Sequence, residues 1–184
     1  MKKMFFVAAF VAVAFIGANA QKGNNQLGVG IDVGIPTGDF GDSFGVGFGG
    51  YVKGMLGVGT GGQLTLTSGY TTYSMKDDIK TLLSVDKASA SIIPILVGYR
   101  HNFSGFYAEP QIGYSILGAR VKASGVTVSD SEGAFAWAAG FGYVVSNFDF
   151  GARYQSMHKD GESDAIVGIR IGYNFSLGGA KVKK

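Results

Sequence analysis

Apolar side chains recur at every second position in eight separate runs of the chain. The runs cover residues 27–35, 44–53, 63–70, 91–103, 106–116, 134–145, 148–155 and 165–175. In the fifth run, for example, Ile112, Tyr114 and Ile116 alternate with Gly113 and Ser115. Because successive side chains of a strand point to opposite faces, this period of two predicts eight β-strands.

The two faces of the predicted strands differ in a way that indicates a membrane. One face collects large apolar side chains and almost no charge, whereas the other mixes glycine, alanine and isolated charges. A small barrel holds glycines and a few paired charges inside, but not eight rows of large apolar side chains. The pattern therefore predicts an all-β fold, an eight-stranded antiparallel up-and-down transmembrane β-barrel. A soluble periplasmic lipocalin-like barrel is the alternative, because eight strands also suit it.

The links between the predicted strands orient this barrel. Ser104-Gly105 and Ser146-Asn147 are two-residue hairpin turns, which are expected on the periplasmic side. The links at 36–43, 74–90, 118–132 and 158–164 are longer and polar, and we expect them outside the cell as extracellular loops.

Strand register places charged side chains in the interior of the predicted barrel. A two-residue turn at Ser104-Gly105 puts Arg100 directly opposite Glu109, and the Ser146-Asn147 turn puts Arg153 opposite Gly140. The expected lumen charge network consists of Asp32, Lys53, Arg100, Glu109, Asp149, Arg153 and Arg170. Since eight strands leave an interior only just wide enough for such side chains, we expect a plugged lumen.

Aromatic side chains on the outward face gather near the strand ends. The expected periplasmic girdle consists of Phe103, Phe106, Tyr143, Phe148, Tyr173 and Phe175. The expected outer girdle consists of Tyr70, Tyr114, Phe135, Trp137 and Tyr154. Rings at these heights are typical of the two interfaces of a membrane barrel.

The N-terminal segment predicts export. Lys2 and Lys3 precede an unbroken apolar stretch at 5–17, and Ala18 and Ala20 form a small-residue cleavage site before Gln21. The expected organisation is a signal peptide at 1–20, an outer-membrane barrel at 21–175 and a short periplasmic tail at 176–184.

Composition removes several classes of function. The 184 residues carry a formal net charge of +3, and the two leader lysines account for most of that excess. A nearly neutral mature chain argues against a nucleic-acid partner, which needs a concentrated basic surface. The absence of cysteine excludes disulfides, thiolate metal sites and a lipoprotein anchor.

Candidate chemistry in the sequence is sparse. Ser156, His158, Glu162 and Asp164 form a Ser/His/acid grouping near the outer end of the seventh run, but nothing else supports a nucleophile. The G-x-G-x-x-G matches at 45–50 and 57–62 do not open a helix after a buried strand, and the two histidines lie at opposite ends. We therefore expect no enzymatic activity, no cofactor and no metal.

Four segments resemble a known family. They read IPILVGY at 93–99, FYAEPQIGY at 106–114, FGARY at 150–154 and GIRIGYNF at 168–175. They are similar to the small, porin-like outer-membrane β-barrel domain family common in Bacteroidota, which has the OmpA/OmpX-like barrel architecture. The resemblance implies a location in the cell outer membrane and a fold, and it implies no activity.

Together these observations predict a monomeric, non-enzymatic outer-membrane protein with a structural or surface-interaction role through its extracellular loops. Its expected contacts are membrane lipids, lipopolysaccharide, the outer-membrane assembly machinery and an unidentified extracellular partner. A small pore for small or hydrophobic solutes is the alternative function, and a lipid-modifying outer-membrane enzyme is a further one.

Overall fold

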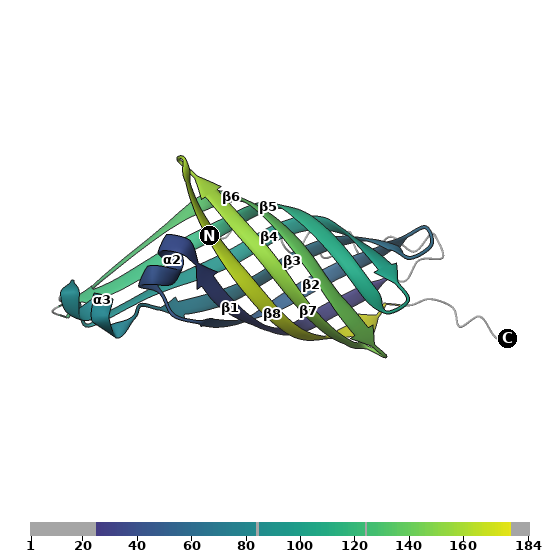
Figure 1. The fold of residues 1–184 in the computed structure, drawn as a ribbon, viewed down its shortest axis with the longest axis horizontal. Helices are drawn as coiled ribbons and strands as arrows, with labels where there is room; N and C mark the ends of the chain where they lie inside the picture. The colour runs from purple at the N-terminus through teal and green to yellow at the C-terminus, as the bar shows by residue number, and fades with distance from the viewer. Residues whose placement is uncertain (1–24, 84, 124, 178–184) are drawn as a thin grey trace.

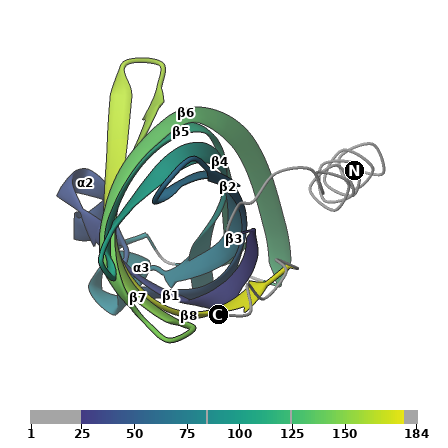
Figure 2. The ribbon, with the colours of Figure 1, turned by 90° about the vertical axis from the view of Figure 1, so that its right-hand side faces the viewer.

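The computed structural model describes residues 25–83, 85–123 and 125–177, and these residues form one closed antiparallel barrel (Figures 1 and 2). The strands are β1 (Gln26–Thr37), β2 (Gly47–Val58), β3 (Gly62–Ser74), β4 (Lys87–Phe103), β5 (Phe106–Ala123), β6 (Val126–Val145), β7 (Phe148–Lys159) and β8 (Glu162–Ser176). Two short helices, α2 (Gly38–Ser43) and α3 (Asp77–Leu82), lie in the links after β1 and β3. The predicted leader at 1–20 and most of the predicted tail lie outside the described residues.

Closure joins the first and last strands. β1 and β8 pair from Gln26 opposite Ser176 to Thr37 opposite Ala165, and every other strand pairs with its neighbours in sequence. The prediction of eight antiparallel up-and-down strands is therefore confirmed. Among the described residues, no helix is long and apolar enough to cross a membrane.

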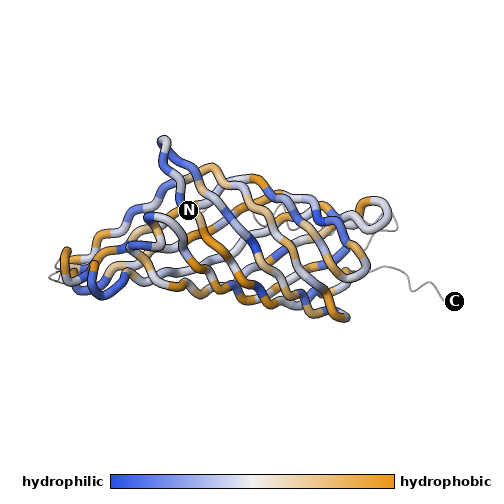
Figure 3. The backbone as a smooth tube through the Cα atoms, in the orientation of Figure 1, coloured by the Kyte–Doolittle hydropathy of each residue, from blue (hydrophilic) through white to orange (hydrophobic). Residues whose placement is uncertain are grey.

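Large apolar side chains cover the outside of the barrel, as predicted. Ile31 is 58% exposed, Ile112 is 57% exposed and Phe48 is 64% exposed. Each of them belongs to a run in which every second residue is apolar and faces outward. Hydrophobic and more polar positions alternate along the strands (Figure 3). So large an apolar outer surface is typical of a membrane barrel, in which lipid covers these side chains.

Glycine in the strands makes room for tyrosine inside the narrow barrel. A Cβ atom on Gly142 would collide with the ring and hydroxyl of Tyr107, one on Gly151 would collide with the same hydroxyl, and one on Gly34 would collide with the side chain of Tyr73. An aromatic ring in such a lumen therefore needs a neighbour without a side chain. This steric requirement accounts for inward-facing glycines that a sheet would otherwise disfavour.

Both predicted two-residue turns are present at the positions expected from the sequence. Ser104 and Ser146 have φ angles of 54° and 57°, and the flanking strands pair from Phe103 opposite Phe106 and from Val145 opposite Phe148. The left-handed backbone of a two-residue turn matches the twist of the strands on either side of it.

The extracellular links differ from the predicted loops. The link at 118–132 is mostly strand, because β5 and β6 continue to pair as far as Ala123 opposite Val126. The link at 158–164 is likewise a hairpin with its turn at Asp160 and Gly161, and the links at 36–43 and 74–90 contain α2 and α3. Beyond the membrane both faces of a strand meet water, so the apolar alternation that marks a strand is lost there.

The position of Phe44 also differs from the prediction. The sequence pattern predicts it on the lipid face of the second strand, but β2 begins only at Gly47 and Phe44 forms an isolated bridge with Met75. Its ring lies 4.9 Å from the ring of Phe40 in α2, and both rings pack against the apolar interior. The link after β1 therefore folds toward the mouth of the barrel instead of along its outer wall.

Candidate functional site

The lumen is filled in layers, and the half toward the two-residue turns contains a charged network. We call Lys53, Arg100, Glu109 and Asp149 the lower cluster; they come from β2, β4, β5 and β7. Glu109 accepts hydrogen bonds from Lys53 Nζ at 2.6 Å and from Arg100 Nε at 3.2 Å, and Arg100 Nη1 donates to Asp149 at 2.8 Å. Two cations thus meet two carboxylates, and all four side chains are buried.

Neutral polar side chains complete the lower cluster. Thr65 donates to Glu109 at 2.7 Å, Gln111 donates to it at 2.9 Å, and Tyr107 donates to Asp149 at 2.7 Å. The Arg100 guanidinium also lies 3.6 Å from the centre of the Tyr107 ring. These hydrogen bonds occupy the carboxylate oxygens, which is what makes a buried ionic network tolerable.

A second group of charges lies farther toward the extracellular end. We call Asp32, Arg153 and Arg170 the upper cluster; Asp32 Oδ2 accepts from Arg170 Nη2 at 2.9 Å and from Arg153 Nη2 at 3.3 Å. Arg170 lies 4.6 Å from the centre of the Tyr51 ring, a cation–π contact. Arg153 faces Gly140 across the β6–β7 pair, which leaves space for its long side chain.

Above both clusters the interior becomes apolar. The apolar plug consists of Tyr73, Ile92, Leu96, Ala134, Ala136, Ala138, Met157 and Ile166. Phe40 and Phe44 pack on it from the extracellular side, so the link after β1 closes over the plug. The lumen is thus occupied along its length, with charges near the periplasm and hydrocarbon toward the outside.

The structure therefore brings all seven predicted lumen residues into the interior and divides them between two clusters. Register within one hairpin predicts the Arg100–Glu109 contact. The Lys53–Glu109 and Arg100–Asp149 contacts join strands that are not neighbours, so no pairing register predicts them. The sequence pattern does not single out Thr65, Gln111 and Asn174, which hydrogen-bond to the carboxylates of the network. Each of them nevertheless lies on the same face of the sheet as the charges.

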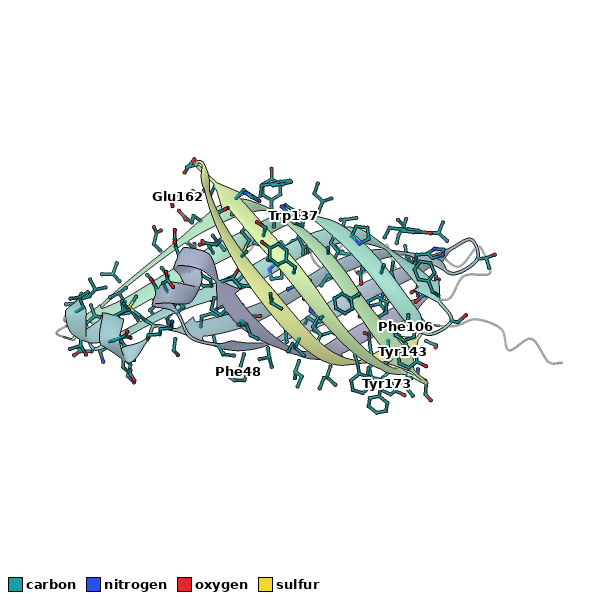
Figure 4. The ribbon with its side chains drawn as sticks, in the orientation of Figure 1. Phe48, Phe106, Trp137, Tyr143, Glu162 and Tyr173 are labelled. Carbon is teal, nitrogen blue, oxygen red and sulfur yellow. The ribbon has the colours of Figure 1, made fainter. Side chains whose placement is uncertain are left out.

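Outward aromatic rings form contacts at two heights on the barrel (Figure 4). Near the periplasmic turns, pairs of ring centroids lie 4.5–5.3 Å apart. The pairs are Phe106–Tyr143, Phe148–Tyr173 and Tyr173–Phe175, and Phe103 packs on His101. Farther out, Trp137 lies 5.6 Å from Tyr154 and Tyr114 lies 6.2 Å from Phe135. The two sets bound the apolar band between them.

The Ser/His/acid grouping of the sequence is only half assembled. Ser156 Oγ lies 2.9 Å from His158 Nε2 on the outer face of β7, and Trp137 Nε1 donates to the same nitrogen at 3.1 Å. Glu162 and Asp164 lie on the inner face of β8, where Asp164 is opposite Met157. The two carboxylates thus lie on the opposite face of the sheet from His158. In the described part of the chain, no group of three or more His, Asp or Glu side chains is placed to hold a metal ion.

Beyond the last β6–β7 pair, Phe135 with His158, the strands β4, β5 and β6 continue as an extracellular extension. Its two faces carry opposite charges. Lys87, Arg120 and Lys122 lie on the outer face, and Lys87 is directly opposite Lys122. Asp130 and Glu132 of β6 lie on the other face, toward the barrel axis. Because like charges placed opposite each other oppose strand pairing, the Lys87–Lys122 pair does not stabilise the pairing of β4 with β5.

Comparisons with known proteins agree with this architecture. The family model for the outer membrane protein beta-barrel domain matches residues 8–175. The comparison with curated proteins found no match.

Three solved structures share the fold. The structure is similar to Ail, the attachment invasion locus protein of Yersinia pestis, with a TM-score of 0.63 and 15% identity over 84% of this chain and 100% of that one. It is also similar to the N-terminal β-barrel domain of Pseudomonas aeruginosa OprF, with a TM-score of 0.58 and 15% identity over 83% and 99% of the two chains. Neisserial surface protein A gives a TM-score of 0.54 and 14% identity over 83% and 97%. A closed ring of eight strands with an apolar exterior and this family match place the protein in the cell outer membrane, and the chain belongs to the outer membrane protein β-barrel domain family.

Proposed function

We propose that this protein is a closed outer-membrane barrel without enzymatic activity, present as a monomer, that acts through surface contacts of its extracellular end. The observation that carries the proposal is the filling of the lumen by two ionic clusters and an apolar plug. A solute crossing this barrel would have to break buried ion pairs and then pass a hydrocarbon layer. The described residues therefore favour a surface role over a pore.

The extracellular extension supports a more specific role, the binding of anionic glycans. Lys87, Arg120 and Lys122 point outward from the extension, and the neighbouring outward positions carry Ser89, Thr127, Ser129 and Ser131. No ion pair in the described part of the chain includes any of the three cations. Arginine and lysine bind phosphate and sulfate groups, and hydroxyls bind sugars. We infer that this face contacts the phosphorylated sugars of lipopolysaccharide or a sulfated glycan outside the cell.

One structural neighbour suggests the first ligand class to test. Ail of Yersinia pestis has been crystallised with sucrose octasulfate, a heparin analogue. That ligand belongs to Ail, and the identity of 16% carries no binding residue over to this chain. The three outward cations of this chain are the independent reason to try the same chemistry here.

Binding of heparin and of purified lipopolysaccharide to the full protein in lipid nanodiscs tests the proposal. We expect a triple variant, Lys87→Gln, Arg120→Gln and Lys122→Gln, to lose most of the binding, and we expect added salt to weaken binding to the parent. A matched triple variant at Lys76, Lys80 and Lys159 removes the same charge elsewhere on the extracellular side and should bind normally. Equal loss in both triple variants would show that only net charge matters.

Planar-bilayer recording addresses the pore alternative directly. We expect the purified protein to give no steady single-channel current, because both ionic clusters and the plug obstruct the lumen. Large and steady currents from the parent protein would overturn the closed-barrel proposal and favour a pore for small solutes.

A further inference from the structure

A cavity of about 330 Å³ lies at the extracellular mouth of the barrel, above the apolar plug. On one side it is bounded by the extension of β4, β5 and β6, and on the other by α2 and the β7–β8 hairpin. These two parts diverge beyond the last β6–β7 pair, which joins Phe135 and His158 (Figure 1). The ion pair of Glu132 with Lys159 connects them across the gap.

The floor and walls of the cavity are apolar. Phe40, Phe44, Ile92, Leu117 and Met157 line it, and Ile92 and Met157 are themselves part of the plug. Small-molecule sites in proteins begin at about 300 Å³, and an apolar cavity of about 150 Å³ already admits benzene. The cavity is therefore large enough for a molecule with one aromatic ring and a short substituent.

Carboxylates form the rim of the cavity. Asp130, Glu132 and Asp164 line it from β6 and β8, and Glu162 lies close by at the tip of the β7–β8 hairpin (Figure 4). Lys159 neutralises Glu132, but no ion pair in the described part of the chain includes Asp130 or Asp164. The entrance thus carries uncompensated negative charge directly above an apolar surface.

Asp164 shows the effect of this arrangement on a single group. Burial raises the pKa of its carboxyl above the ordinary value, and the negative charges of Glu162, Asp39 and Glu132 raise that pKa further. A cation placed among these groups would relieve their mutual repulsion.

We propose that this cavity binds a small amphipathic cation, an ammonium group attached to a short apolar or aromatic body. The apolar part would lie on Ile92, Leu117 and Met157, and the ammonium group would lie between Asp130 and Asp164. The charge of the rim selects the cation over a neutral or anionic molecule of the same shape. This site is separate from the outward cations of the β4–β6 extension, so it does not depend on the proposed glycan contact.

Three probes that are similar in shape but differ in charge isolate the contribution of charge to binding. Isothermal titration of the full protein in lipid nanodiscs would compare phenethylamine with phenethyl alcohol and hydrocinnamate. We expect the amine to bind most tightly and hydrocinnamate least tightly. Asp130→Asn and Asp164→Asn should each weaken binding of the amine roughly two- to fivefold, the range of an ion pair on a solvent-accessible rim. Neither change should affect the alcohol, and Asp78→Asn on α3 is the matched control.

Filling the cavity tests its location. Ala119 lines the cavity and Ser129 lies on the outer face of the same hairpin, so Ala119→Trp should abolish binding of the amine whereas Ser129→Trp should not. Lowering the pH should weaken binding of the amine as Asp164 takes up a proton, and the alcohol should show no such dependence. Equal affinity for amine and alcohol, no measurable binding of the amine, or unchanged binding in Ala119→Trp would each overturn the proposal.

Discussion

Replacing Glu109 with glutamine removes the central negative charge of the lower cluster and keeps the volume of the side chain. In the parent, Glu109 is the ion-pair partner of both Lys53 and Arg100. Arg100 retains Asp149 after the change, whereas no other ion pair in the described part of the chain includes Lys53. The substitution therefore leaves one ammonium group, only 4% exposed, without a counter-charge.

The magnitude follows from that burial. Breaking a buried ion pair by removing one partner costs about 3–5 kcal/mol, because the remaining charge is neither solvated nor paired. Replacing Lys53 with methionine in the same chain removes the stranded charge, so we expect Lys53→Met/Glu109→Gln to be more stable than Glu109→Gln alone. The coupling between the two sites should be about 2–3 kcal/mol, the upper part of the range for residues in contact. Lys53 is the compensating partner, since removing Arg100 would also strand Asp149.

Unfolding by urea in lipid vesicles measures these differences. Trp137 is the single tryptophan of the chain and lies on the outer face beside Tyr154. Its fluorescence therefore changes when the barrel unfolds and the indole ring leaves the lipid. Asp77→Asn and Lys80→Met on α3 provide the matched control, because their ion pair is exposed to water and should show no resolvable coupling. Strict additivity of Lys53→Met and Glu109→Gln would refute the reasoning, as it would mean that water screens this contact inside the lumen.

Four further changes test other parts of the structure. Val97→Arg on the lipid face should cost about 2–4 kcal/mol in the same unfolding assay, whereas Val128→Arg on the extracellular extension should not alter stability; equal effects would mean that the membrane band is misplaced. Ser146→Gly should be tolerated, but Ser146→Val should cost about 1–2 kcal/mol because of the left-handed backbone at this turn. Phe175→Ala removes a ring that packs on Tyr173 and should lower the amount of folded protein in the outer membrane, measured after fractionation. Because the pKa of Asp164 is raised in the folded chain, its ionised form opposes folding; stability should rise as the pH falls through that pKa, and Asp164→Asn should remove this dependence.

The sequence alone was sufficient to predict the eight-stranded barrel and its location in the outer membrane. Alternating apolar residues mark each strand within the lipid because one face of every strand meets hydrocarbon and the other meets a narrow lumen. The two-residue turns at Ser104-Gly105 and Ser146-Asn147 set the register of their hairpins, which is why the position of Arg100 opposite Glu109 could be predicted. These features are local in the chain, or repeat at a period that the chain itself displays.

The tertiary structure decided what lies outside the lipid and between distant strands. The extended β5–β6 hairpin could not be predicted, because strands surrounded by water lose the apolar alternation that identifies them. Phe44 was misplaced for the opposite reason, because it continues the alternation of β2 in sequence but packs on Phe40 outside that strand. The contact of Lys53 with Glu109 and the cavity above Ile92 depend on closure of the barrel. Closure brings together side chains from strands that are not neighbours in sequence, and their meeting depends on the curvature and width of the barrel, which no local pattern encodes.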